Sequence, residues 1–177
     1  MWAKDKIRGF TIVELLIVIV VIGILATITI VAYNGTQARA RDTQRASDAR
    51  NILTALEAYK AINNTYPVAT STAGSGSYEL STETAGTFME YLQTTFSTGV
   101  PVDPINDTNH YYRYYRYSEA NLTTYGCATN KGNLMVFYAV GFENASNMPQ
   151  SDPPLVCTST SWGGSATSYF KYRFENG

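Results

Sequence analysis

The sequence predicts an α+β protein: one long N-terminal α-helix, apolar in its first half and amphipathic in its second, with an antiparallel β-sheet head packed on the C-terminal half of the helix. Two observations predict the helix, an apolar run over residues 10–32 and an amphipathic continuation over residues 33–66. A third predicts the sheet, because residues 67–177 contain several short segments rich in strand-forming aromatic residues. Residues 1–9 form a short leader before the helix, and 177 residues suffice for one compact domain besides an anchor.

The apolar run predicts a membrane-spanning helix. Phe10–Ala32 is close in length to the ~20 residues that a helix needs to cross a bilayer. Lys4, Lys6 and Arg8 precede it and are opposed by Asp5 alone. The positive-inside rule therefore keeps the leader in the cytoplasm and sends the rest of the chain outward.

Three interpretations of this N-terminal segment compete. A cleaved secretory signal peptide would end in a small-residue cleavage site, which Ile30-Val31-Ala32 matches poorly. A plain single-pass anchor leaves Glu14 unexplained, because a carboxylate is costly inside lipid. The third interpretation is a class III signal, which is cut before the apolar run, between Gly9 and Phe10.

The residues at this junction resemble the N-terminus of the type IV pilins and of the pseudopilins of type II secretion. They are a small residue, a phenylalanine, a glutamate five residues into the mature chain, and an unbroken apolar helix, in the run Gly9-Phe10-Thr11-Ile12-Val13-Glu14 followed by Leu15–Ala26. The resemblance extends over about residues 8–67. It implies cleavage after Gly9 by a prepilin peptidase and N-methylation of Phe10. It also implies a membrane-held precursor, a homopolymer of pilin copies, an assembly ATPase and a platform membrane protein.

A charge-pairing role for Glu14 follows from its position. Glu14 lies one helical turn after Phe10, so in a bundle of such helices its carboxylate can meet the new amine of a neighbour. The pair would compensate two charges that an apolar environment penalises and would set the stagger between subunits. The alternative is that Glu14 reaches the lipid head groups. Many family members have a proline where this chain has Val31, which leaves open whether the helix melts in a filament.

The second half of the helix has an apolar stripe and a charged surface. The stripe has spacings of three and four residues and consists of Ala49, Ile52, Leu53, Leu56, Tyr59 and Ile62. Two hypotheses fit the charges, an electrostatic collar between subunits or a solvated face with pairs such as Asp42–Arg45. Asn63-Asn64 and Tyr66-Pro67 predict the helix end, which gives a helix of roughly 80 Å.

The head is predicted to hold one short helix and three strands. The helix is Thr84–Phe96, and the strands are 110–117, 134–140 and 169–174. In the tyrosine-rich strand, Tyr112, Tyr114 and Arg116 share one face, and Tyr111, Arg113, Tyr115 and Tyr117 share the other. Such rings and arginines could bind single-stranded nucleic acid or sugars, but packing in the core is the favoured interpretation.

Two further sites are predicted in the head. Cys127 and Cys157 are the two cysteines, and outside the cytoplasm they predict a disulfide, with two buried thiols as the alternative. Asp103, Asn106 and Asp107 loosely resemble a turn of the major pseudopilins, whose heads bind calcium. Their oxygens are of the type that calcium prefers, although a turn capped by aspartate and proline explains them equally well.

The composition and motifs favour a structural protein over an enzyme. A net charge of -1 gives no support to nucleic-acid binding, and no catalytic triad, metal cluster or phosphate loop is found in the sequence. We expect no cofactor apart from the calcium alternative. The favoured function is the major subunit of a type IV pilus-like extracellular filament. The alternatives are a pseudopilin of a type II-like secretion system and a membrane-anchored binding protein that uses the tyrosine strand.

Overall fold

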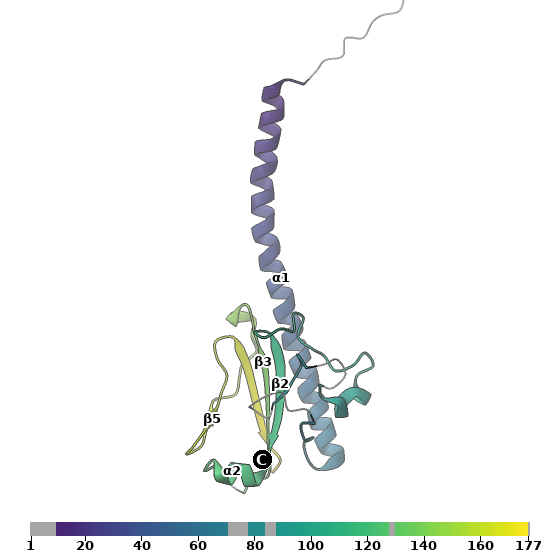
Figure 1. Cartoon of the computed structure of the whole chain (residues 1–177), viewed down its shortest axis with the longest axis vertical. Helices are drawn as coiled ribbons and strands as arrows, with labels where there is room; N and C mark the ends of the chain where they lie inside the picture. The colour runs from purple at the N-terminus through teal and green to yellow at the C-terminus, as the bar shows by residue number, and fades with distance from the viewer. Residues whose placement is uncertain (1–9, 71–77, 84–87, 128–129, 177) are drawn as a thin grey trace, which may run out of the picture. The chain divides into compact units, whose positions relative to one another are not determined.

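The computed structural model describes residues 10–70, 78–83, 88–127 and 130–176 (Figure 1). The chain divides into two compact units, Met1–Ala38 and Arg39–Gly177. Helix α1 (Ile12–Asn63) supplies residues to both units. The leader of residues 1–9, including the predicted cleavage residue Gly9, lies outside the described residues.

Helix α1 confirms the long helix that the sequence predicts. It begins at Ile12, two residues after the predicted start, and ends at the predicted Asn63. Asn64 follows with a φ of 57°, in the left-handed conformation that commonly ends helices and that asparagine tolerates better than most residues. The asparagine pair is therefore the local cause of the helix end.

The second unit contains a four-stranded antiparallel sheet in the order β1-β2-β3-β6. Its strands are β1 (Glu79–Leu80), β2 (Tyr111–Tyr117), β3 (Leu134–Val140) and β6 (Ser168–Phe174). The three longer strands confirm the three predicted ones. In register, Tyr114 of β2 faces Phe137 of β3, which faces Lys171 of β6.

One face of the sheet packs on the part of α1 that belongs to the second unit (Figure 1). Alternate residues of β2 and β3 contribute to this core together with one residue of β6, as the two-residue period of a strand predicts. The helix contributes Ala46, Ala49, Ile52, Ala55 and Leu56, and the strands contribute Tyr112, Tyr114, Met135, Phe137, Ala139 and Tyr169. The sheet thus buries the apolar residues of this helix stripe.

The opposite face of the sheet is covered as well. It packs against α2 (Glu119–Thr124) and against a small hairpin of β4 (Leu155–Val156) and β5 (Ser161–Trp162). Leu122 and Trp162 bring these elements into contact with Tyr117 and Val136. The 3-10 helix η2 (Ala145–Asn147) lies in the connection after β3. Both faces of the tyrosine strand therefore belong to cores, as the favoured interpretation expects.

Two sequence predictions are wrong in detail. Ile62 ends the predicted apolar stripe but is 80% exposed, because the sheet covers α1 only up to earlier turns. The predicted helix Thr84–Phe96 falls partly on residues 84–87, outside the described residues. Over the described part, a turn is followed by the 3-10 helix η1 (Glu90–Thr95), since Met89 has a φ of 48° and an α-helix cannot continue through it.

The contrast between Ile52 and Ile62 gives a matched test of the packing. Ile52 has no exposed surface, whereas Ile62 on the same helix is 80% exposed. We expect Ile52→Ala to lower the free energy of unfolding by about 2–5 kcal/mol, because it leaves a cavity in the core, and Ile62→Ala to change it by less than ~0.5 kcal/mol. Urea denaturation of the full chain in detergent measures both values, and equal losses in the two variants would contradict this arrangement.

Candidate assembly site

The N-terminal end of α1 is held by a capping box between Thr11 and Glu14. The backbone N–H and the hydroxyl of Thr11 both donate to Oε2 of Glu14, at 2.9 and 2.8 Å. In return, the backbone N–H of Glu14 donates to Oγ1 of Thr11 at 3.2 Å. This reciprocal pair satisfies backbone donors that have no partner inside a helix. The carboxylate of Glu14 is therefore kept at the head of the helix, one turn from Phe10.

The first unit presents an apolar surface along this helix. The large hydrophobic side chains that the structure describes here are between 47 and 89% exposed, and they are Phe10, Ile12, Val13, Leu15, Leu16, Ile17, Val18, Ile19, Val20, Val21, Ile22, Ile24, Leu25, Ile28, Ile30 and Tyr33. The segment is long and apolar enough to cross a membrane. An apolar surface of this extent is not stable in water, since each such side chain gains about 1.5–3 kcal/mol from burial.

The hydroxyl groups inside this apolar segment are satisfied by their own helix. Thr27 donates to the carbonyl of Gly23 at 2.8 Å, and Thr29 donates to that of Leu25 at 2.9 Å. These bonds remove the cost of placing a hydroxyl in an apolar environment, and they loosen the helix slightly. Threonines that bond in this way are compatible with lipid and with a packed helix bundle.

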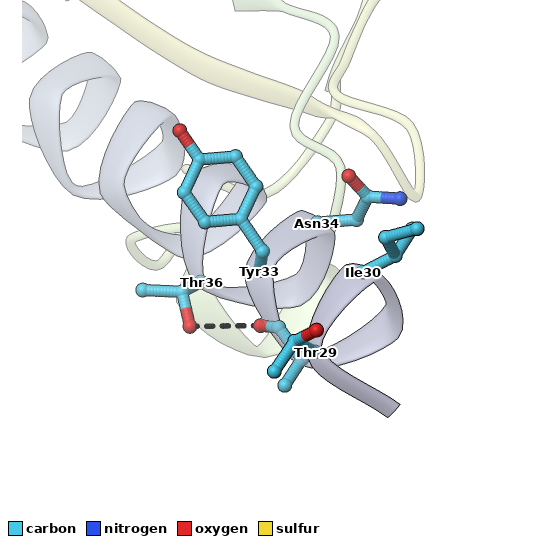
Figure 2. A pocket seen from close by; sticks show the side chains of 6 residues that line it. Thr29, Ile30, Tyr33, Asn34 and Thr36 are labelled. Atoms are coloured by element: carbon cyan, nitrogen blue, oxygen red, sulfur yellow. Dashed lines mark hydrogen bonds between the residues drawn. The ribbon is translucent and has the colours of Figure 1, made fainter. Parts of the chain in front are cut away.

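A shallow hollow lies on the helix surface around Tyr33 (Figure 2). It is lined by Thr29, Ile30, Ala32, Tyr33, Asn34 and Thr36, and Thr36 donates to the carbonyl of Ala32 at 3.0 Å within it. All six residues come from about two turns of one helix, so they cannot surround a small ligand.

A buried ionic cluster around Arg45 is the main feature of the second unit that sequence reasoning missed. The Arg45 guanidinium is fully buried and donates to Asp103 at 2.7 and 3.1 Å, to Asp42 at 2.9 Å and to Glu143 at 3.2 Å. Arg41 also binds Glu143, at 2.6 Å. Three segments far apart in sequence thus share one arginine.

The cluster corrects both hypotheses for two of the charges of α1, Asp42 and Arg45. Asp42 and Arg45 have no exposed surface, so neither is part of a solvated face or free to reach another subunit. The predicted Asp42–Arg45 ion pair is present in the structure. Asp42 also accepts the backbone N–H groups of Glu143 and Asn144 at 2.9 Å each, so the pair binds the segment that follows β3. Breaking one partner of such a buried network is costly, on the order of 3–5 kcal/mol.

The predicted calcium ligands are engaged in hydrogen bonds within the protein. Both oxygens of Asp103 accept from Arg45, and Oδ1 also accepts the N–H groups of Ile105 and Asn106. Asn106 bonds Ser81, while Asp107 accepts from His110. Among the described residues, no group of three or more His, Cys, Asp or Glu side chains is placed to hold a metal. The Arg45 guanidinium lies where a cation beside Asp103 would bind.

The tyrosine strand uses its arginines internally. The Arg113 guanidinium lies 3.9 Å from the ring centroid of Tyr138 and 4.7 Å from that of Tyr78. Arg116 donates to Thr65 and to the carbonyl of Tyr66 on the helix side. The stacking groups that a nucleic-acid or sugar site would need are thus already paired within the second unit.

The two cysteines are joined in a disulfide, Cys127–Cys157. Cys127 follows α2 and Cys157 follows β4, so the bond ties the helix to the hairpin on the outer face of the sheet. Closing 30 residues of chain in this way removes conformational freedom from the unfolded state. The disulfide therefore supports the smaller of the two cores.

Comparison with known proteins agrees with these features. A prokaryotic N-terminal methylation motif matches residues 4–30. The chain is 40% identical over 67 residues to the type II secretion system core protein G of Escherichia coli (strain K12), which covers 38% of this chain and 46% of that protein. The protein of the same name from Dickeya chrysanthemi is 28% identical over 119 residues, which cover 67% of this chain and 76% of that protein.

The more identical of these matches cover only part of each relative. The corresponding protein of Pectobacterium carotovorum subsp. carotovorum is 38% identical over 60 residues, or 38% of its length. The chain thus spans less than half of the Escherichia coli and Pectobacterium relatives. No solved structure gives a significant match. The methylation motif and these relatives support a likeness of the chain to the type IV pilins and pseudopilins, which are structural proteins.

The pKa of Glu143 gives a test of the ionic cluster. The hydrogen bonds from Arg41, and also from Arg45, lower this pKa from 4.5 to about 2. A carboxylate with a lowered pKa stabilises the folded state above its ordinary pKa, and this contribution is lost as the pH falls toward 2. We expect Glu143→Gln to lower the melting temperature at pH 7. Between pH 4.5 and 2, the melting temperature of this variant should fall less steeply than that of the wild type.

Thermal unfolding of the full chain in detergent at several pH values measures this effect. Glu90→Gln is the control, since Glu90 is an exposed glutamate on η1. Parallel pH curves for the wild type and Glu143→Gln would show that the cluster contributes nothing to acid sensitivity.

The state of Asp103 leads to a prediction about calcium. Because the guanidinium of Arg45 already neutralises this carboxylate, we expect neither millimolar calcium nor a chelator to shift the melting temperature of the wild type. A ligand that binds the folded state raises the melting temperature, so a clear increase with calcium would contradict the prediction and point to a metal site elsewhere in the chain.

Proposed function

We propose that this chain is a pseudopilin, a subunit of a short periplasmic filament that acts as a piston in a type II-like secretion system. The relatives are named as core proteins of that system, which supports this function better than the long surface pilus that the sequence alone favoured. The observation that carries the proposal is the exposed apolar helix with one capping carboxylate at its head. Such a helix requires lipid before assembly and other copies of itself afterwards.

In this proposal the precursor waits in the cytoplasmic membrane. A prepilin peptidase cuts it after Gly9, and Phe10 becomes the methylated first residue. An assembly ATPase and a platform membrane protein then drive the helix out of the lipid into a bundle with other copies. Burial of the helices against one another replaces their contact with lipid tails.

The geometry at the helix head is compatible with charge pairing between subunits. The hydrogen bonds from Thr11 both end on Oε2 of Glu14, and a carboxylate has a second oxygen that can accept from the amine of a neighbouring Phe10. The capping box fixes the direction in which this carboxylate is presented. The same residue can thus start its own helix and set the position of the next subunit.

A long surface pilus is the second candidate function. One observation favours it, namely the disulfide Cys127–Cys157, because type IV pilins often carry a disulfide-closed segment near the C-terminus. Deleting the gene separates the two functions. Loss of protein secretion without loss of long surface fibres supports the pseudopilin, and loss of long fibres supports the pilus.

The role of Glu14 can be tested with two variants. Glutamine preserves a capping box but carries no charge, whereas alanine loses both functions. If charge pairing sets the stagger, we expect Glu14→Gln and Glu14→Ala to abolish or strongly reduce filaments, as judged by electron microscopy of sheared fibres and by secretion of a reporter protein. Normal assembly with glutamine would show that the charge is not needed and that the capping role alone is preserved.

A further inference from the structure

Strand β6 forms one edge of the sheet, and part of this edge is covered by a neighbouring segment. An uncovered edge strand exposes N–H and C=O groups that another extended chain can bind. Here Asp152 donates its N–H to the carbonyl of Phe170 at 2.9 Å, and Ser151 Oγ accepts the N–H of Phe170 at 3.0 Å. Further along, Oδ2 of Asp152 accepts the N–H of Tyr172 at 3.1 Å.

The carboxylate of Asp152 accepts the N–H of Tyr172, which the carbonyl of an added strand would otherwise accept. Two cations hold it there, Lys171 at 2.6 Å and Arg173 at 2.9 Å. Burial opposes the ionisation of Asp152, but the bond from Lys171 and the N–H of Tyr172 lower its pKa below the ordinary value. The carboxylate is therefore a stable cover for this part of the edge.

The cover ends immediately after Asp152. The next two residues are Pro153 and Pro154, which have no N–H group to donate to an edge strand. Because Phe170 and Tyr172 both use their N–H groups on this edge, the alternation of an antiparallel strand directs the backbone of Phe174 to the same edge. The last outward-facing position of β6 is thus the place where a further chain can approach.

A pocket of about 350 Å³ lies at this end of the strand. It is lined by Lys131, Asp152, Pro153, Tyr172, Arg173 and Phe174. Pro153 and two aromatic rings, whose centroids are 6.1 Å apart, provide apolar walls. The pocket therefore has an apolar surface for a side chain next to an open strand edge.

The charge of the pocket favours an anionic group. The ammonium of Lys131 lies 5.2 Å from the ring centroid of Phe174 and forms no ion pair with any described residue. The side chain of Arg173 is 51% exposed. Asp152 is the one acidic residue of the lining, and both Lys171 and Arg173 bind it. An acidic side chain of a partner would find the ammonium of Lys131 and, beside it, the half-exposed guanidinium of Arg173, which also donates to the carbonyl of Tyr172 at 2.7 Å.

We propose that this pocket and the open end of β6 bind an extended acidic segment of a partner protein. A carboxylate of the segment lies between Lys131 and Arg173, an apolar side chain packs on Tyr172 and Phe174, and the main chain continues the sheet past the Asp152 cover. This mode combines backbone hydrogen bonds for affinity with pockets for specificity. The proposal concerns the second unit alone and does not depend on which filament the chain builds.

The partner is a different protein and not a second copy of this chain. Outside the membrane-length segment and the buried or paired carboxylates, the exposed acidic residues that the structure describes are Glu57, Glu90, Asp107 and Glu119. Three of them lie on helices, and Asp107 lies in a turn that its own side chain stabilises. None of these four is on an extended segment that could pair with a strand edge.

Binding of designed peptides to the full chain in detergent tests the proposal. The probe is a fluorescent peptide that alternates aspartate with valine, and the comparison peptide has asparagine in place of aspartate. We expect saturable binding of the aspartate peptide by fluorescence anisotropy, roughly tenfold weaker binding of the asparagine peptide, and further weakening of the aspartate peptide at high salt.

Variants of two lysines locate the site. Lys131→Glu should weaken binding of the aspartate peptide at least roughly tenfold, and Lys131→Gln should give an intermediate value. Lys60→Glu is the matched control, because Lys60 lies 5.1 Å from the ring centroid of Tyr66 in a similar contact away from the pocket. Unchanged melting temperatures show that the variants fold.

Three outcomes overturn the proposal. The first is the absence of saturable binding by the wild type, and the second is equal affinity for the two peptides. The third is a loss of self-association in Lys131→Glu without any effect on peptide binding, which would make a second copy of this chain the occupant. A loss confined to Lys131 and to the aspartate peptide supports it.

Discussion

The apolar surface of the first part of α1 is the constraint on which the rest of the protein depends. Sixteen large apolar side chains that the structure describes here are 47–89% exposed, and burying each of them is worth about 1.5–3 kcal/mol. No rearrangement of one helix can hide a surface that surrounds it on all sides. The helix must therefore lie in lipid or among copies of itself, and the capping box at its head adds one oriented carboxylate to an otherwise uniform surface.

The second unit, in contrast, buries its apolar residues within itself. The sheet buries the apolar stripe of α1, and α2 with the β4–β5 hairpin buries the outer face of the sheet. An ionic cluster and a disulfide then hold the connecting segments against these cores. The guanidinium of Arg45 gathers the segments around Asp103 and Glu143, and the disulfide Cys127–Cys157 ties the outer elements together.

These arrangements also limit the functions that remain. The tyrosine strand is a poor candidate for a ligand site, because its rings and arginines contact other groups of the protein. The turn at Asp103 is a poor candidate for a calcium site, because the guanidinium of Arg45 already pairs with this carboxylate. Assembly through the N-terminal helix is left as the function with the strongest physical basis, and the secretion role proposed above rests on it.

Local patterns in the sequence determined the long helix, its end at Asn63, three of the strands and the two faces of the tyrosine strand, because periodicity and terminal residues act over a few neighbouring positions. They also determined the apolar segment and its single carboxylate. Tertiary structure alone decided that Arg45 and Asp42 are buried, since their partners in other segments lie 58 to 105 residues away along the chain. It likewise decided that Ile62 is exposed and that Asp152 covers an edge strand, because burial and strand edges depend on which distant segments come together.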